Sequence, residues 1–272
     1  MYHTKVMPEG PECHYAGYRL EQQLKGKQVT AFSILGGRYK KHGAFQGYND
    51  LIKHIESGNH VVKAVGCRGK LIVMFFMNDW CVLSTLGLKG SWATRRSKHC
   101  DVALVASGNT KLWFKDQLHY GTLKYVTLKD AEKKILSLGP DVTVKDPAFT
   151  REYLDTLLNK YQKWELTKLI MDQAKISGIG NYLKAEILYR SRLPPTLLCQ
   201  DLAPDDVAKL YDAVMDIPYQ FFEKKFGRSR ISRHVYNRSR DKMGNKVEKC
   251  KTGDGRTSHW VPALQTRDVP VS

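Results

Sequence analysis

The chain has 272 residues, which is enough for one large domain or two of ordinary size, each with a sizeable core. Its 44 Lys and Arg residues outnumber its 27 Asp and Glu residues, and the formal net charge of +17 indicates a polyanionic partner. No apolar run approaches the length of a membrane-spanning helix, so nucleic acid is favoured over a membrane surface as that partner.

The first predicted element is a helix over residues 11–25. Ala16, Leu20 and Leu24 recur one helical turn apart with polar residues between them, and Gly26 supplies a C-terminal stop. The first six residues have no apolar core and cannot form a secretory signal, so an intracellular protein is expected.

A proline stands directly behind a methionine just ahead of this helix. If translation starts at Met7 and that methionine is removed, Pro8 becomes a free secondary amine. Such an amine can attack a sugar C1′ and form an iminium, with Glu9 as the proton donor and acceptor. The alternative is structural, because Pro11 followed by Glu12 is also typical of an ordinary first helical turn.

From residue 28 to about residue 126 the pattern changes to short runs of β-branched and aromatic residues between Gly, Asn and Asp turns. Six runs have the length and spacing of strands in a sandwich or barrel. They lie at 61–65, 71–77, 81–84, 102–106, 112–114 and 123–126. The N-terminal half is therefore expected to be mainly β.

A domain boundary is expected near Leu138-Gly139-Pro140-Asp141, where two breakers stand together. Beyond it the apolar residues follow a helical period. The predicted helices cover residues 148–160, 162–175, 181–190 and 203–222. These helices are interpreted as a second domain.

Two glycines spaced by one residue lie between the second and third of these helices. Gly178 and Gly180 allow positive φ and a close approach of backbone amides, and Asn181 opens the next helix. The N–H groups at such a helix start favour an anion, so a phosphate fits there. An ordinary tight turn between two packed helices is the alternative.

Basic residues concentrate at 224–256, where twelve Lys and Arg residues face three Asp and Glu residues. Residues 233–236 and 255–261 are predicted as two strands of a hairpin, with residues 241–245 as the turn. A solvated, disordered basic tail is the alternative.

The segment from Gly178 to Arg190 resembles the helix–two-turn–helix signature of the Fpg/Nei DNA glycosylases, the family of formamidopyrimidine-DNA glycosylase and endonuclease VIII. Further motifs of that family occur in the same order. They are Pro-Glu-Gly-Pro-Glu at 8–12, Lys70 in Gly69-Lys70-Leu71, Leu-Gly-Pro-Asp at 138–141, Leu-Ile-Met-Asp at 169–172 and Pro194. Motifs in this order over most of the chain are hard to obtain by chance.

Many members of this family end in a zinc finger, and the chain departs from that pattern. Val261 and Leu264 stand where the last two cysteines belong, and Met243 and Lys246 stand where the first pair belongs. The six cysteines of the chain include no Cys-x-x-Cys pair, so no metal is expected. Arg256 is kept although the metal ligands are absent. This pattern resembles the zincless finger of Nei-like enzymes from giant viruses, animals and plants, and most of all that of the giant-virus type.

The resemblance implies an α+β fold, in which an N-terminal β-sandwich with a leading helix precedes a helical domain with the helix–two-turn–helix and a zincless antiparallel β-hairpin finger. Strand pairing and aromatic packing of Tyr236 and Trp260 are expected to hold the finger. The expected divisions are an extension at 1–7 that is absent from the active form, the sandwich catalytic domain at 8–135, a linker at 136–147, the helix–two-turn–helix domain at 148–223, the finger at 224–265 and a tail at 266–272.

The resemblance also implies a bifunctional DNA glycosylase and AP lyase that needs no cofactor. Pro8 is expected to be the nucleophile and Glu9 the proton carrier, with Lys70 on the phosphate beside the lesion. Asn181 and Arg256 are expected to grip the same stretch of backbone, together with the amides of Gly178 and Gly180. Strand cleavage by β-elimination and then δ-elimination follows from the family alone.

In the family, two loops fill the hole that a flipped nucleotide leaves in the duplex. The first loop matches residues 86–90 and implies Leu88 as a wedge. The second carries an arginine and then a phenylalanine, and this chain has Leu118 and Tyr120 at those positions. A leucine cannot hydrogen-bond the orphaned base, so weak discrimination of the opposite base is expected.

The segment at 222–235 is short and basic, whereas formamidopyrimidine-DNA glycosylase proper has a long loop there that covers 8-oxoguanine. Oxidised pyrimidines and hydantoins are therefore expected over 8-oxoguanine. The expected partner is damaged double-stranded DNA, with single-stranded DNA as a further substrate, and no membrane. A monomer in the nucleus or another DNA-containing compartment is expected.

Two other functions stay open on the sequence alone. The helix–two-turn–helix also occurs in proteins that only bind nucleic acid, and seven residues precede Pro8 as the chain is written. A basic structural protein would require the motifs to be coincidental. Borohydride trapping on abasic DNA separates these functions, because only the enzyme forms a reducible imine.

Overall fold

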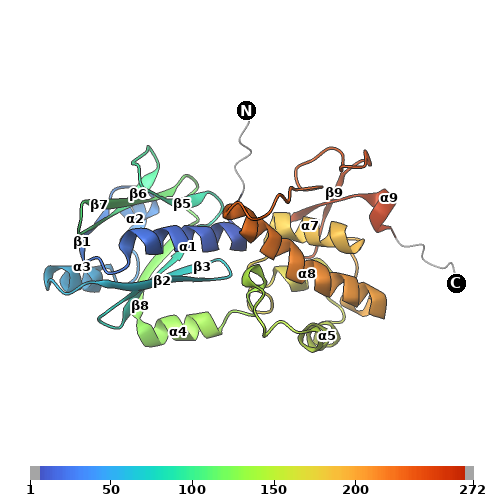
Figure 1. Ribbon diagram of the computed structural model, residues 1–272, viewed down its shortest axis with the longest axis horizontal. Helices are drawn as coiled ribbons and strands as arrows, with labels where there is room; N and C mark the ends of the chain where they lie inside the picture. The colour runs from blue at the N-terminus through green and yellow to red at the C-terminus, as the bar shows by residue number, and fades with distance from the viewer. Residues whose placement is uncertain (1–6, 267–272) are drawn as a thin grey trace. The chain divides into compact units, whose positions relative to one another are not determined.

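In the computed structural model, residues 7–266 are described and the chain forms two compact units (Figure 1). The first unit contains Pro8 and Glu12–Ser137, and the second contains Glu9–Pro11 and the chain from Leu138 onward. The expected N-terminal extension and C-terminal tail fall almost entirely on residues 1–6 and 267–272, which lie outside the described residues.

The first unit is a sandwich of two four-stranded antiparallel sheets. One sheet has the strand order β1-β6-β7-β5, with β1 at Val29–Ile34, β6 at Cys100–Ala106, β7 at Thr110–Asp116 and β5 at Gly90–Ala93. The other has the order β2-β3-β4-β8, with β2 at Val62–Arg68, β3 at Leu71–Phe76, β4 at Trp80–Thr85 and β8 at Thr122–Thr127. All six strands expected from the sequence are present, which confirms the N-terminal β-sandwich.

One hydrophobic core lies between the two sheets. Phe32 and Leu104 reach it from the first sheet, and Ile72 and Met74 reach it from the second. The central strand β3 reads LIVMFF without a polar residue because α4 (Leu128–Leu136) contacts it as well, so both of its faces are covered.

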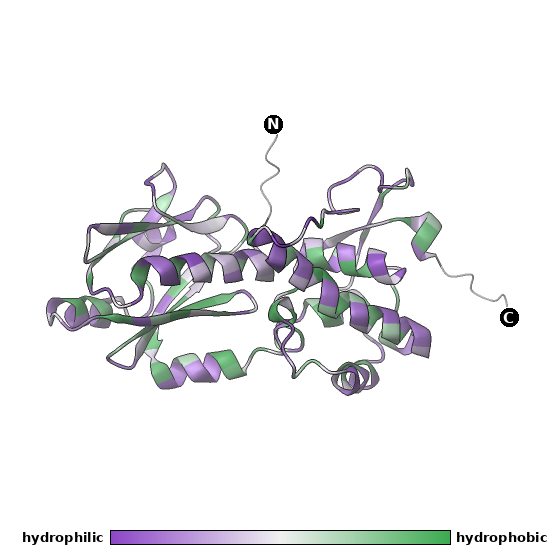
Figure 2. Ribbon diagram, viewed as in Figure 1, coloured by the Kyte–Doolittle hydropathy of each residue, from purple (hydrophilic) through white to green (hydrophobic). Residues whose placement is uncertain are grey.

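Helix α1 (Gly10–Leu24) adds Leu20 and Leu24 to this core and packs Ala16 against it, as the spacing of its apolar residues predicted; Cys13 joins the core as well. The sequence did not predict the two short helices α2 (Gly37–His42) and α3 (Tyr48–Glu56) or the helix α4. Figure 2 shows hydrophobic and hydrophilic residues together on α1 and α4, as expected for helices with only one face on a core.

The second unit is mainly helical. Its elements are η1 (Val142–Val144), α5 (Arg151–Lys160), α6 (Leu166–Met171), α7 (Asn181–Ser191), η2 (Cys199–Asp201), α8 (Pro204–Lys225), β9 (Glu248–Lys251), β10 (Thr257–Trp260) and α9 (Pro262–Gln265). All four predicted helices are present, although α6 is much shorter than expected. No helix among the described residues is long and apolar enough to cross a membrane.

Helix α7 lies at the centre of the second unit and is buried on nearly all sides. It contacts α6, α8, α9 and β10, and buries every residue of its length except Asn181 and Arg190. Two of the buried side chains, Lys184 and Glu186, are charged. A charged residue is rarely buried without a partner, so both must be paired within the fold.

The finger hairpin pairs different strands from those predicted. Strand β10 lies where the second strand was expected, but its partner is β9 and the connecting turn covers residues 252–256. Residues 233–236 are not a strand, because the amides of His234, Val235 and Tyr236 donate to the Glu186 carboxylate. The expected turn at 241–245 is present and is closed by one isolated bridge from Arg240 to Lys246.

Candidate active site and nucleic-acid interface

The Glu9 side chain is buried against the first turn of α7. Its Oε2 accepts hydrogen bonds from the amides of Gly180 and Leu183 at 2.9 and 3.1 Å, and its Oε1 accepts one from the Tyr182 amide at 2.7 Å. These N–H groups have no partner inside the helix, and the positive end of the helix dipole faces the carboxylate. Glu9, the residue after Pro8, is thus joined to a turn 171 residues further along the chain.

Gly178 and Gly180 make this close approach possible. A Cβ on Gly180 would lie 2.3 Å from Glu9 Cδ, and Gly178 has φ of +101°, which side-chain-bearing residues rarely adopt. We expected both glycines to offer their amides to a DNA phosphate. The Gly180 amide instead donates to Glu9, and the Gly178 amide donates to Gln173 Oε1 at 3.1 Å. A phosphate contact at these glycines stays a prediction.

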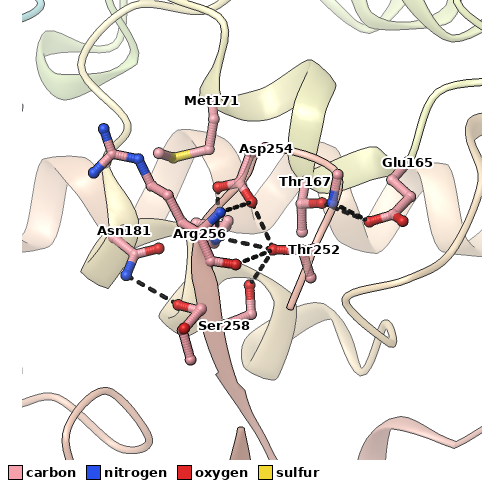
Figure 3. A network of polar contacts seen from close by, with 12 residues as sticks. Glu165, Thr167, Met171, Asn181, Thr252, Asp254, Arg256 and Ser258 are labelled. Atoms are coloured by element: carbon pink, nitrogen blue, oxygen red, sulfur yellow. Dashed lines mark hydrogen bonds and ion pairs between the residues drawn. The ribbon is translucent and has the colours of Figure 1, made fainter. Parts of the chain in front are cut away.

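Asn181 connects the start of α7 with the finger. Its Nδ2 donates to the Thr257 carbonyl at 3.1 Å, directly after Arg256 in the sequence (Figure 3). Arg256 is exposed, and it ends the turn of the finger hairpin. The two side chains that we expected to grip the DNA backbone are therefore brought to neighbouring parts of the second unit.

Tyr236 packs on a different ring from the one expected. Its ring lies 4.9 Å from His259 and 6.3 Å from Tyr182, measured between ring centroids. Trp260 follows His259 on the same strand, and successive side chains point to opposite faces, so His259 rather than Trp260 faces Tyr236. Burial raises the pKa of the Tyr236 hydroxyl.

Lys70 lies in the tight turn between β2 and β3, as the sequence predicted. The preceding Gly69 has φ of +57°, the left-handed conformation that such two-residue hairpins use. Lys70 is half-buried at the end of two rigidly paired strands. The hairpin therefore fixes the backbone of Lys70.

The three side chains expected to fill the duplex come from two loops of the first unit that touch each other. Leu88 is half-buried in the turn between β4 and β5, whereas Leu118 and Tyr120 are 39% and 62% exposed. A Cβ on Gly87 would lie 2.9 Å from Tyr120 Cβ, so the two loops are in direct contact. The two loops therefore lie against each other, with Leu118 and Tyr120 exposed.

The second of these loops, at residues 117–121, is held by buried carboxylates. Asp116 accepts hydrogen bonds from the amides of Leu118 and Gly121 at 3.1 and 2.5 Å. Asp101 Oδ2 lies 2.9 Å from His119 Nδ1. The exposed Leu118 and Tyr120 thus stand on a loop whose backbone is fixed from within.

Two family models match the chain. The formamidopyrimidine-DNA glycosylase N-terminal domain matches residues 7–123, and the formamidopyrimidine-DNA glycosylase H2TH domain matches residues 138–230. The chain belongs to the formamidopyrimidine-DNA glycosylase and endonuclease VIII family. Glu9 lies in the first matched domain and its three amide partners lie in the second, so the buried carboxylate joins the two family signatures.

Relatives from both branches of this family cover nearly the whole chain. A formamidopyrimidine-DNA glycosylase of Pelotomaculum thermopropionicum is 26% identical over 95% of this chain and 99% of its own length. An endonuclease 8 of Escherichia coli is 28% identical over 95% of this chain and 100% of its own length.

A solved structure shows the same fold. Formamidopyrimidine-DNA glycosylase of Lactococcus lactis, bound non-covalently to DNA containing an AP site, has a TM-score of 0.83 and 20% identity to this chain. It covers 96% of this chain and 100% of its own. At this identity the likeness establishes the fold and leaves the chemistry to the residues themselves.

The hairpin of the finger, β9 and β10, lies beyond both matched domains, and the finger residues do not fit the structural zinc of other family members. Cys250 pairs with Ser258 across the hairpin, so His259, the next residue, points to the opposite face. Cys250 and His259 therefore cannot share one ion. Within residues 7–266, no group of three His, Cys, Asp or Glu side chains is arranged to hold a metal.

Several residues that build the site were not predicted from the sequence. They are Lys184, Glu186, Asp254, Asp116 and Asp101, all of them charged side chains that are buried or nearly so. A charged residue in a sequence is interpreted as solvent-exposed unless its partner is known. For Lys184 and Glu186 a signal was available, because both lie in α7, where most of the other residues are apolar or aromatic.

Proposed function

We propose that the chain is a bifunctional DNA glycosylase and AP lyase of base excision repair, which removes an oxidised base through an imine on Pro8. The observation that carries this proposal is the burial of Glu9 on the first turn of α7. It joins the residue beside the nucleophile to the segment that carries Asn181. The basic composition and the two matched domains support DNA as the substrate.

The chemistry begins with the free amine of an N-terminal Pro8. Its nitrogen lone pair attacks C1′, the bond from C1′ to the damaged base breaks, and the base leaves with that electron pair and takes up a proton. The sugar ring then opens at the bond from C1′ to O4′, which gives the iminium. Glu9 takes the proton that the Pro8 nitrogen loses and passes it to O4′. Three amide hydrogen bonds stabilise the carboxylate between these transfers.

Strand cleavage follows from the same intermediate. The iminium acidifies C2′, so loss of a C2′ proton expels the 3′ phosphate by β-elimination. Loss of a further sugar proton expels the 5′ phosphate by δ-elimination, which rests on likeness to the family. Water then releases the sugar fragment and restores the Pro8 amine. This scheme requires an active form that begins at Pro8.

Three side chains are proposed to hold the phosphates around the lesion. Lys70 at its hairpin turn binds the phosphate next to the damaged nucleotide, and Asn181 and Arg256 bind the adjoining backbone. A guanidinium presents several donors in a plane and can grip two phosphate oxygens at once. These contacts carry no base information, so they fix the register of the DNA and leave lesion choice to other groups.

The touching loops of the first unit are proposed to fill the space left by the flipped nucleotide. Leu88, Leu118 and Tyr120 are all apolar or aromatic, and two of them are exposed. Leu118 has no hydrogen-bonding group for the orphaned base, so the enzyme should discriminate weakly among opposite bases. The short basic segment at 222–235 supports oxidised pyrimidines and hydantoins as substrates over 8-oxoguanine, with single-stranded DNA as a further substrate.

Borohydride reduction on DNA with one abasic site tests this proposal. The enzyme should form a covalent adduct whose protein end is the Pro8 nitrogen, located by mass spectrometry of the digested product. A non-catalytic DNA-binding protein would shift the DNA in a gel and give no adduct. A form that begins at Pro8, binds damaged DNA tightly and traps no imine at any pH would contradict the proposed function.

A further inference from the structure

A buried ion pair joins α7 to the turn of the finger. Lys184 Nζ lies 2.7 Å from Asp254 Oδ2, and the two side chains are 0% and 4% exposed. Burial opposes the charge on Asp254, but the hydrogen bonds from Lys184 and Thr252 outweigh it and lower the pKa of this carboxyl. A buried charge that loses its partner is strongly destabilising, so each member of the pair fixes the other.

Asp254 also organises the turn at residues 252–256. Its Oδ1 accepts a hydrogen bond from the Thr252 hydroxyl at 2.6 Å and one from the Arg256 amide at 3.3 Å. The Thr252 amide donates to the Arg256 carbonyl at 3.1 Å, and the Thr252 hydroxyl lies 3.0 Å from Ser258 Oγ. Both main-chain groups of Arg256 are therefore fixed, while its side chain points away from this network (Figure 3).

A second anchor holds the other side of the turn. The Gly253 amide donates to Glu165 Oε2 at 2.6 Å, and the Thr167 hydroxyl donates to the same oxygen at 3.3 Å. The hairpin itself has only two strands of four residues each, which is too little for independent stability. The position of the turn thus depends on contacts with the helical part of the unit.

We propose that Lys184 and Asp254 are positioning residues, whose ion pair is a metal-free clamp that holds the finger turn on α7 and presents Arg256 to a DNA phosphate. This inference rests on the proposed phosphate contact of Arg256. Neither clamp residue contacts DNA, since both side chains are buried. Their effect on binding passes through the backbone of residues 252–256, which Asp254 holds by two hydrogen bonds.

The test is a double-mutant cycle between Lys184→Met and Arg256→Ala in the whole protein. The measured quantity is the affinity for duplex DNA with a stable abasic-site analogue, over a series of salt concentrations. Lys184→Met should weaken binding about tenfold, as expected for the loss of one charge-assisted hydrogen bond. It should also lower the salt slope by about one unit. In the Arg256→Ala background it should change neither quantity, because no guanidinium remains to be positioned.

Two further variants make the result specific. Lys145→Met also removes one lysine and one ion pair, since Lys145 lies 3.2 Å from Asp216 with 42% and 46% of the two side chains exposed. It should leave the salt slope near the wild-type value. If Lys184→Met does not fold, Asp254→Asn replaces it, because asparagine removes the charge and keeps an oxygen for Thr252 and Arg256.

Each outcome decides the matter. Wild-type affinity and slope in folded Lys184→Met or Asp254→Asn, or losses that add to that of Arg256→Ala, would overturn the clamp and leave the contact of Arg256 intact. Wild-type binding by Arg256→Ala would show that the phosphate contact itself is wrong. The clamp proposal would then be wrong as well, because Arg256 would have no phosphate contact for the clamp to support.

Discussion

Glu9→Gln, compared with Glu186→Gln, should separate the proton transfer proposed for Glu9 from its structural role. Both carboxylates are buried in the second unit, and each accepts hydrogen bonds from three backbone amides. The partners of Glu186 are the amides of His234, Val235 and Tyr236, at 2.8, 3.0 and 3.0 Å. Glu186 is therefore a control that is buried and bonded to three backbone amides as Glu9 is, and it has no proposed part in the chemistry; His234 Nδ1 also lies 3.7 Å from its Oε2.

The stability cost of the two substitutions should be similar. A glutamine has one oxygen and one NH₂ group, so it keeps two of the three bonds and turns its NH₂ toward the third amide. The orphaned donor is Tyr182 N–H in Glu9→Gln and His234 N–H in Glu186→Gln, and one such buried group costs about 1–3 kcal/mol. Losing the charge at the start of α7 adds about 0.3–1 kcal/mol for Glu9.

The activities of the two variants should differ widely. Single-turnover removal of an oxidised base should slow by about 100- to 10,000-fold in Glu9→Gln, the usual contribution of a general acid or base. Glu186→Gln should stay near the wild-type rate, with a drop in thermal midpoint that matches that of Glu9→Gln. If both variants lose similar stability and Glu9→Gln still cleaves at the wild-type rate, Glu9 is a helix cap and carries no proton.

Three further outcomes are expected. Arg256→Ala and Asn181→Ala should weaken DNA binding for all lesions alike, and Arg256→Ala should lower the salt slope by about one unit; a changed ranking of lesions would count against both phosphate contacts. Purified protein should contain no stoichiometric zinc by elemental analysis, and bound zinc that is lost together with activity on chelation would contradict this expectation. His60 should make the fold sensitive to acid, because burial and the nearby His54 lower its pKa from 6.5 to about 4. Between about pH 6.5 and 4 the unfolded chain binds a proton at His60 and the folded chain does not. As the pH is lowered through this window, the free energy of unfolding therefore falls by up to about 3 kcal/mol. His60→Gln should flatten this part of the pH profile measured by denaturant unfolding, and an unchanged profile would refute the assignment.

The sequence predicted the elements of this fold that are defined by local pattern. The six strands in the first half show runs of β-branched and aromatic residues, and the helix from Gly10 shows apolar residues one turn apart. Strands β1 and β5 were both missed; β5 has only four residues and begins with Gly90. The short helix α3 was missed because it lies inside a region whose overall composition favours strands.

The sequence could not predict the contacts that assemble the site, because they join residues far apart in the chain. Glu9 and Gly180 were each singled out, yet nothing local shows that a carboxylate rather than a phosphate occupies the start of α7. The misplaced finger strand has the same cause. Glu186 lies in a helix about fifty residues earlier, and its carboxylate accepts hydrogen bonds from the amides of residues 234–236. Tertiary partners of this kind override local propensity.

The identity of the nucleophile is tested most directly by two purified proteins that differ only at the start. One begins at Met1, as confirmed by intact mass, and the other begins at Pro8. In the longer protein the Pro8 nitrogen is a tertiary amide without a nucleophilic lone pair, and an ordinary lysine such as Lys70 is protonated at pH 7 and should trap only slowly. The form that begins at Pro8 should therefore cut abasic DNA and trap with borohydride far faster than the longer form. Equal rates for the two forms would show that Pro8 is not the nucleophile.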